Sequence, residues 1–180
     1  MTSGSETQNA IHWPERYLPG TTDNFVTNEV IVEGLSQHEI WPLLADTSKW
    51  TSYYDNASDP VFPHRDGPLL HQGSVFSFST FGFPPLAAEV VEYAEPGADE
   101  PGRLSWTAKQ HGPPEDALDV LHCWLVEDLP AGRVRILTQE SQIGEPAAQL
   151  ARRKPNPLLI GHQAWLDGLV AAAGTGKTAT

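Results

Sequence analysis

The chain has 180 residues and a formal net charge of -12 at pH 7, from 23 acidic and 11 basic residues. This length suits one domain with a sizeable hydrophobic core and leaves no room for a second domain. The scattered Lys and Arg residues argue against nucleic acid or an anionic membrane surface as a partner, because both require clustered positive charge.

The single cysteine, Cys123, cannot form a disulfide within the chain, which is typical of a reducing compartment. The opening residues "MTSGSETQNA" have neither the basic region nor the apolar run of a secretory signal. No stretch approaches the roughly 18 apolar residues of a membrane span. We therefore expect a cytoplasmic protein without membrane insertion.

Residues 1–23 read as a polar leader, with its first ten residues disordered and with Trp13, Tyr17 and Leu18 able to dock on the domain. The alternating run "NFVTNEVIVEG" predicts a first strand over residues 24–34. Ser36 and Glu39 then form a capping-box pattern that opens a short helix over residues 37–46. A second short helix or turn is predicted directly after it, over residues 47–54.

The middle of the chain predicts a run of antiparallel strands separated by Gly and Pro. These strands are expected near residues 59–63, 73–82, 85–95, 102–111, 117–129 and 132–144. After them, "NPLLIGHQAWLDGLVAAA" places Leu158, His162, Trp165 and Leu169 at helical spacing, with Pro157 in the first turn. This pattern predicts a long helix that ends the domain near residue 173, followed by a flexible tail over residues 174–180.

Two segments resemble a known superfamily. "VTNEVIVEGLSQHEIWPLLADTSKW", residues 26–50, looks like the opening of the START-like or SRPBCC superfamily, which includes polyketide cyclases and dehydratases and Bet v 1-like proteins. "EVVEYAEPGADEPGRLSW", residues 89–106, is similar to its strand, Pro-containing turn and strand. The resemblance spans residues 24–173. It implies an α+β helix-grip fold, in which a curved antiparallel sheet of about six to seven strands wraps around a long C-terminal helix and leaves a deep apolar pocket.

Within residues 117–144 the side chains of a hairpin alternate between two faces. A turn centred on "LPAG" with Glu127 opposite Arg135 places His122 opposite Glu140 on the inner face. A slip of one residue would put Glu140 on the outer face instead. Arg133 and Arg135 are expected to face water. The same register puts further inner-face residues opposite one another: Trp124 with Thr138, and Val126 with Ile136.

The predicted pair of His122 and Glu140 combines two groups that can move protons on a bound carbonyl compound. His122 would act as the acid or base, and Glu140 would fix its tautomer. The carboxylate raises the pKa of an imidazole, whereas burial lowers it. The alternative is a buried pair that satisfies its own polar atoms at the end of the sheet.

Several aromatic residues are candidates for the wall of a pocket that takes a flat, apolar ligand, although core packing explains them as well. His162 lies on the same side of the last helix, and Tyr54 follows the second short helix, where it could close the mouth of the pocket. The predicted ligand-binding residues are Trp124, Trp106, Phe76, Phe78, Thr138, Ile136, His162, Trp165 and Tyr54.

His122, Glu140 and His162 are also residue types that bind zinc. No short-spaced pair such as HxH or HExxH accompanies them, so the sequence predicts no metal site and no cofactor.

Together the residues and the resemblance favour an enzyme that binds a small hydrophobic, aromatic or polyketide-like molecule and promotes its cyclisation or dehydration. A carrier or sensor of an apolar ligand, or a co-chaperone-like interaction domain, remains the alternative, because the superfamily also contains hydrolases, lipid carriers and co-chaperone domains and a fold does not fix a function. The chain is expected to act as a monomer or homodimer.

Overall fold

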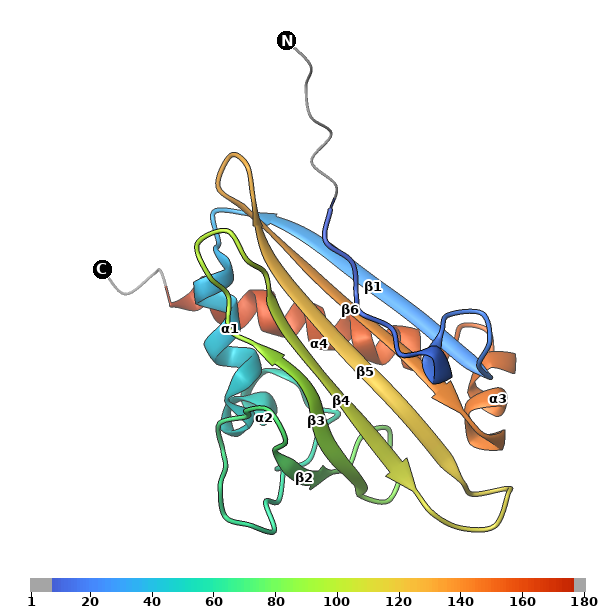
Figure 1. Ribbon diagram of the computed structural model, residues 1–180. Helices are drawn as coiled ribbons and strands as arrows, with labels where there is room; N and C mark the ends of the chain where they lie inside the picture. The colour runs from blue at the N-terminus through green and yellow to red at the C-terminus, as the bar shows by residue number, and fades with distance from the viewer. Residues whose placement is uncertain (1–7, 177–180) are drawn as a thin grey trace.

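The computed structural model describes residues 8–176. It contains one six-stranded antiparallel sheet with the strand order β1-β6-β5-β4-β3-β2 (Figure 1). The strands are β1 (Asn24–Glu33), β2 (Val75–Phe78), β3 (Leu86–Ala94), β4 (Gly102–Gln110), β5 (Leu118–Leu129) and β6 (Arg133–Ile143). The predicted strand near residues 59–63 is wrong, because Val61 makes only an isolated bridge to Ser77.

The helices flank this sheet and complete the predicted α+β helix-grip fold. Glu39 caps the first helix as expected, since its Oε2 accepts a hydrogen bond of 2.8 Å from the backbone N–H of Ser36. The short helices after β1 are α1 (Gln37–Ala45), η2 (Thr47–Lys49) and α2 (Trp50–Tyr53). The C-terminal helices are α3 (Glu145–Arg152) and α4 (Pro157–Thr175), and η1 (Glu15–Tyr17) precedes the sheet.

Helix α4 lies across the concave face of the sheet (Figure 1). Its apolar side buries Trp165, Leu166 and Leu169 in the main hydrophobic core. Trp50 joins the same core and donates its indole N–H to the carbonyl of Leu44 at 2.9 Å. The helix and the sheet therefore enclose an interior that is mainly aromatic.

The N-terminal segment covers the opposite face of the sheet. Ile11 and Tyr17 are buried there against Leu121, Leu125 and other outward-facing residues of β5 and β6. The predicted docking of this segment is confirmed for Tyr17, whose hydroxyl donates to Asp119 at 2.7 Å. Leu18 remains 40% exposed.

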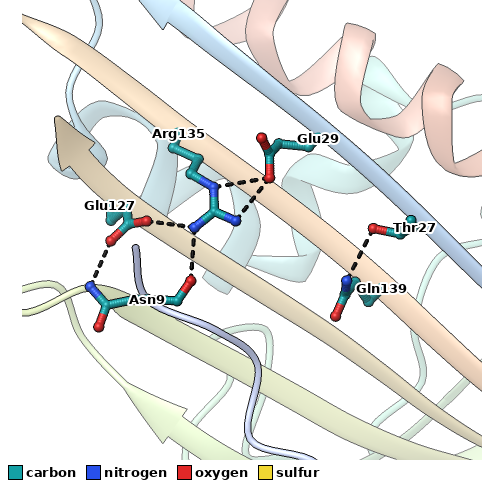
Figure 2. A network of polar contacts seen from close by, with 6 residues as sticks. All are labelled: Asn9, Thr27, Glu29, Glu127, Arg135 and Gln139. Carbon is teal, nitrogen blue, oxygen red and sulfur yellow. Dashed lines mark hydrogen bonds and ion pairs between the residues drawn. The ribbon is translucent and has the colours of Figure 1, made fainter. Parts of the chain in front are cut away.

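Arg135 contradicts the expectation that it faces water, because it is buried beneath the N-terminal segment. Its guanidinium donates to Glu127 at 2.7 Å, to Glu29 at 2.8 Å and to the carbonyl of Asn9 at 2.8 Å (Figure 2). From the alternation of residues in the hairpin alone, the outer face is predicted to be exposed to solvent. Here a segment more than 100 residues away covers it.

Asn9 also donates to Glu127 at 2.6 Å, so this part of the first ten residues is ordered against the sheet rather than disordered. The predictions for residues 1–7 and for residues 177–180 lie outside the described part of the chain. Helix α4 continues to Thr175, slightly past the predicted domain end. Among residues 8–176, no helix combines the length and apolar character needed to cross a membrane.

Candidate functional site

The predicted hairpin register is confirmed. His122 of β5 pairs with Glu140 of β6, in the same register that pairs Glu127 with Arg135. Nδ1 of His122 lies 3.3 Å from Oε2 of Glu140. Both side chains are buried, with exposed fractions of 3% and 8%. The two ionisable groups therefore face each other inside the protein.

Helix α4 adds a third member to this cluster. Nε2 of His162 lies 3.1 Å from the same carboxylate oxygen, Oε2 of Glu140. The imidazole rings of His122 and His162 stack with their centroids 4.4 Å apart and their planes 8° from parallel. One carboxylate oxygen thus contacts two buried imidazoles, one from the sheet and one from the helix. We call His122, Glu140 and His162 the buried triad.

Hydrogen bonds hold two members of the buried triad in place. Nε2 of His122 lies 2.8 Å from the hydroxyl of Thr138, and Gln142 donates to Oε1 of Glu140 at 2.6 Å. Nδ1 of His162 is buried without a hydrogen-bond partner. Sequence reasoning did not assign Gln142 to the site, although it shares a strand face with Glu140 two residues away.

Burial lowers the pKa of His122 well below its usual value, and the adjacent His162 lowers it further. A positive charge on this ring would have to leave water and sit beside a second imidazole, which costs free energy. His122 is therefore neutral in the folded protein near pH 7. Of the two opposing effects weighed from the sequence, burial is the stronger.

A small cavity of about 30 Å³ adjoins the buried triad. This volume accommodates about two water molecules. One end is polar and is formed by the buried triad with Gln142. The rest of the wall is mainly aromatic and aliphatic, and includes Phe78, Phe81, Phe83, Leu86, Trp106, Leu118, Val120, Leu150, Leu158 and Trp165.

The structure divides the predicted ligand-binding residues into two groups. Trp106, Phe78, His162 and Trp165 line the cavity together with His122 and Glu140. The remaining predicted residues are buried but lie behind this wall: Phe76, Trp124, Thr138, Ile136 and Tyr54. Thr138 reaches the site through His122, and Tyr54 stacks on Trp165 at 4.6 Å between ring centroids.

Phe81 and Phe83 line the cavity but were not predicted from the sequence. Phe81 and Gly82 have φ angles of 56° and 72°, and Phe83 N–H bonds to the Thr80 carbonyl at 3.0 Å, as is typical of a type I′ turn. Glycine adopts a positive φ freely, whereas a phenylalanine there costs about 1 kcal/mol. Phenylalanine is not among the residues that signal such a turn, so the sequence offered no clear signal.

The buried triad also has the side-chain types of a metal site, with one donor atom from each residue within 4.8 Å of the others. A ring nitrogen binds a metal along a lone pair that lies in the plane of the ring. Because the two rings are stacked nearly parallel, one ion bound to both would lie outside at least one ring plane. Metal binding to both rings would therefore require one imidazole to turn, and Oε2 of Glu140 likewise does not lie in both ring planes at once.

The known proteins that are similar to this chain are found among solved structures. No protein-family model matches the chain, and no curated protein matches it. The hypothetical protein jhp0584 from Helicobacter pylori is 47% identical, with a TM-score of 0.89, over 94% of this chain and 99% of that chain.

More distant structures share the fold at low sequence identity. Norcoclaurine synthase from Thalictrum flavum, in complex with a transition-state analogue, is 11% identical over 86% of this chain and 96% of its own, with a TM-score of 0.60. The di-domain aromatase/cyclase BexL of the BE-7585A biosynthetic pathway is 12% identical over 81% of this chain and 45% of its own, with a TM-score of 0.56.

The helix-grip architecture agrees with the resemblance seen in residues 26–50 and 89–106. The identity with jhp0584 extends over nearly the whole of both chains. The chain therefore belongs to the family of the Helicobacter pylori protein jhp0584, and its fold is START-like, or SRPBCC-like.

Proposed function

We propose that the protein binds a small hydrophobic molecule with an aromatic group between the sheet and α4, and promotes its cyclisation or dehydration by acid–base catalysis. The observation that carries this proposal is the contact of one carboxylate oxygen, Oε2 of Glu140, with both His122 and His162 at the polar end of an aromatic cavity. Titratable groups that converge in a pocket are the usual components of acid–base sites.

Glu140 is the central member of the buried triad, because its carboxylate contacts both imidazoles and lines the cavity with them. Ring nitrogens of His122 and His162 lie close to its Oε2, at 3.3 and 3.1 Å. Thr138 bonds to the other nitrogen of His122 and fixes its ring. Acid–base catalysis of this kind contributes about 10²- to 10⁴-fold to a rate.

Dehydration of a β-hydroxy ketone illustrates the chemistry. A base removes a proton from the carbon beside the carbonyl, and an acid gives a proton to the departing hydroxyl, which leaves as water. A carboxylate paired with imidazoles can serve both steps. A cyclisation that forms a carbon–carbon bond to a carbonyl begins with the same proton removal.

The fold relatives support this choice of function by analogy. BexL is an aromatase/cyclase and norcoclaurine synthase is a synthase, and both share the helix-grip architecture with this chain. The buried triad belongs to this chain and is independent of those names. The assignment to acid–base chemistry therefore rests on its own geometry, because a shared fold does not fix an activity.

Tryptophan fluorescence tests ligand binding, because Trp106 and Trp165 line the cavity. The protein is titrated with a β-hydroxy ketone formed from benzaldehyde and acetone, with a naphthol, and with a medium-chain fatty acid. We expect saturable quenching by the two aromatic compounds and a weaker response to the fatty acid. No saturable response to any of the three would overturn the proposal.

A further inference from the structure

A second hollow lies directly outside the cavity of the buried triad. It has a volume of about 440 Å³ and lies between the turn that precedes β3 and the helices α3 and α4. Phe81, Phe83 and Leu150 line both spaces. The outer hollow, which we call the outer groove, is also lined by Asn56, Pro146, Gln149, Arg153 and Pro157.

Phe81 lies between the two spaces, because it lines both of them. Its ring rests against Gly161 of α4 so closely that a Cβ at position 161 would overlap Cε1 and Cζ of the ring. The positive φ of Phe81 keeps the ring in this place at the expense of backbone strain.

A chain of hydrogen bonds connects Phe81 to the cavity wall. Its backbone N–H donates to Oδ1 of Asn56 at 2.9 Å, and Nδ2 of Asn56 donates to the hydroxyl of Tyr54 at 2.9 Å. The Tyr54 ring stacks on Trp165. These contacts link the backbone of Phe81 to an aromatic ring of the inner cavity.

The outer groove presents a positive charge. Within residues 8–176, the Arg153 side chain has no hydrogen bond or ion pair to another side chain, whereas Arg152 contacts Glu145 at 3.1 Å. Arg152, Arg153 and Lys154 are consecutive and exposed. In a chain of net charge -12, this is a local site for an anionic group.

We propose that the ligand site is bipartite and takes an aromatic molecule with an anionic group. The aromatic part enters past Phe81 toward the buried triad, and the anionic group remains in the outer groove beside Arg153. This inference rests on the proposed function, because it names the class of molecule that the same cavity receives. The joined volumes reach the range of roughly 300 to 1,000 Å³ found for small-molecule sites, which the inner cavity alone does not.

Two fluorescent probes test the anionic subsite. Anilinonaphthalene sulfonate carries a sulfonate, and phenylnaphthylamine has the same aromatic body without it. We expect Arg153→Gln to weaken binding of the sulfonate probe about tenfold and of the neutral probe less than twofold, since a charge-assisted contact accounts for about one order of magnitude. Lys49→Gln, at an exposed lysine outside the groove lining and outside this basic run, serves as the control and should change neither affinity.

Stopped-flow mixing with phenylnaphthylamine tests the role of Phe81. Phe81→Asn removes the ring and places a residue that type I′ turns favour, so the fold is kept. We expect it to raise the association rate constant at least threefold. Gly161→Ala should act in the same direction by displacing the ring, and it should have no added effect when combined with Phe81→Asn.

The outcomes separate this inference from the proposed function. If both probes bind the wild-type protein but Arg153→Gln lowers the affinity for both equally, the proposal of a bipartite site is wrong, whereas the proposed ligand binding is retained. Unchanged association rates in Phe81→Asn and Gly161→Ala would likewise contradict the closing role of Phe81. If neither probe binds the wild-type protein, the proposed binding function fails together with the inference.

Discussion

Oε2 of Glu140 lies 3.1 Å from Nε2 of His162, so a carboxylate on β6 contacts an imidazole on α4 inside the protein. The contact joins the sheet to the helix that closes its concave face. Both side chains are buried, with exposed fractions of 8% and 1%. Interactions between such groups are stronger than those between the same groups in water.

A double-mutant cycle with Glu140→Gln and His162→Gln should show a coupling free energy of about 1 kcal/mol or more in urea unfolding. The exposed pair His12 and Glu92 offers a matched control, because it has the same side-chain types at 2.7 Å but His12 is 68% exposed. Its coupling should stay below about 0.5 kcal/mol. Equal coupling in the two pairs would show that burial does not strengthen the Glu140–His162 contact.

The lowered pKa of His122 predicts a loss of stability in acid. The unfolded chain takes up a proton near pH 6.5, whereas the folded protein resists it until a lower pH. The free energy of unfolding therefore falls as the pH drops below about 6.5. Glu140 from β6 and His162 from α4 are the titratable groups that face this ring.

Urea unfolding at about pH 7.5 and about pH 5 checks this expectation. The wild-type protein should lose more stability between the two values than the His122→Gln variant, which lacks the titrating ring. Carboxyl groups elsewhere titrate in both proteins and cancel in the comparison. Equal losses would mean that His122 does not resist protonation in the folded protein.

Removal of Arg135 should destabilise the protein, because Glu127 would remain buried without its partner (Figure 2). We expect Arg135→Leu to lower the free energy of unfolding by about 3 kcal/mol. Arg133→Leu, an exposed arginine on the same strand, should change it by less than about 0.5 kcal/mol. Comparable effects at both positions would contradict the buried ion network.

The N-terminal segment should protect Cys123, whose thiol is buried and whose pKa burial raises to about 12. A combined Ile11→Ala and Tyr17→Ala variant loosens the residues that cover the outer face of the sheet. Its reaction with a thiol-reactive disulfide should be at least about tenfold faster than that of the wild-type protein. Leu18→Ala, at an exposed neighbour, is the control and should react at the wild-type rate. Indistinguishable rates in all three proteins would mean that this segment does not shield the thiol.

The sequence was sufficient to predict the positions of those site residues that follow the periodicity of a single strand, hairpin or helix. Alternation in residues 117–144, with a short turn and the pairing of Glu127 with Arg135, placed His122 opposite Glu140. Helical spacing placed His162 on the buried side of α4. Each of these inferences depends only on neighbours along one element.

Features set by distant contacts could not be predicted in this way. The burial of Arg135 depends on Asn9, and the small size of the cavity depends on how the aromatic core packs. The position of the Phe81 ring could not be predicted either, because it depends on contact with Gly161 of α4, which is distant in the sequence. Helix α3, which was not predicted, does carry a local signal, namely Pro146 in its first turn with Ala147 and Leu150 on one face.

The most direct test of acid–base chemistry at Glu140 compares binding with turnover in Glu140→Gln. The substrate is the β-hydroxy ketone of benzaldehyde and acetone, whose dehydration to benzalacetone is followed by ultraviolet absorbance. We predict that the variant binds the compound within about twofold of the wild-type affinity but dehydrates it at least about 100-fold more slowly. The exposed Glu115→Gln should match the wild-type protein. Equal dehydration rates in the wild-type protein and Glu140→Gln would contradict a catalytic role for the buried triad.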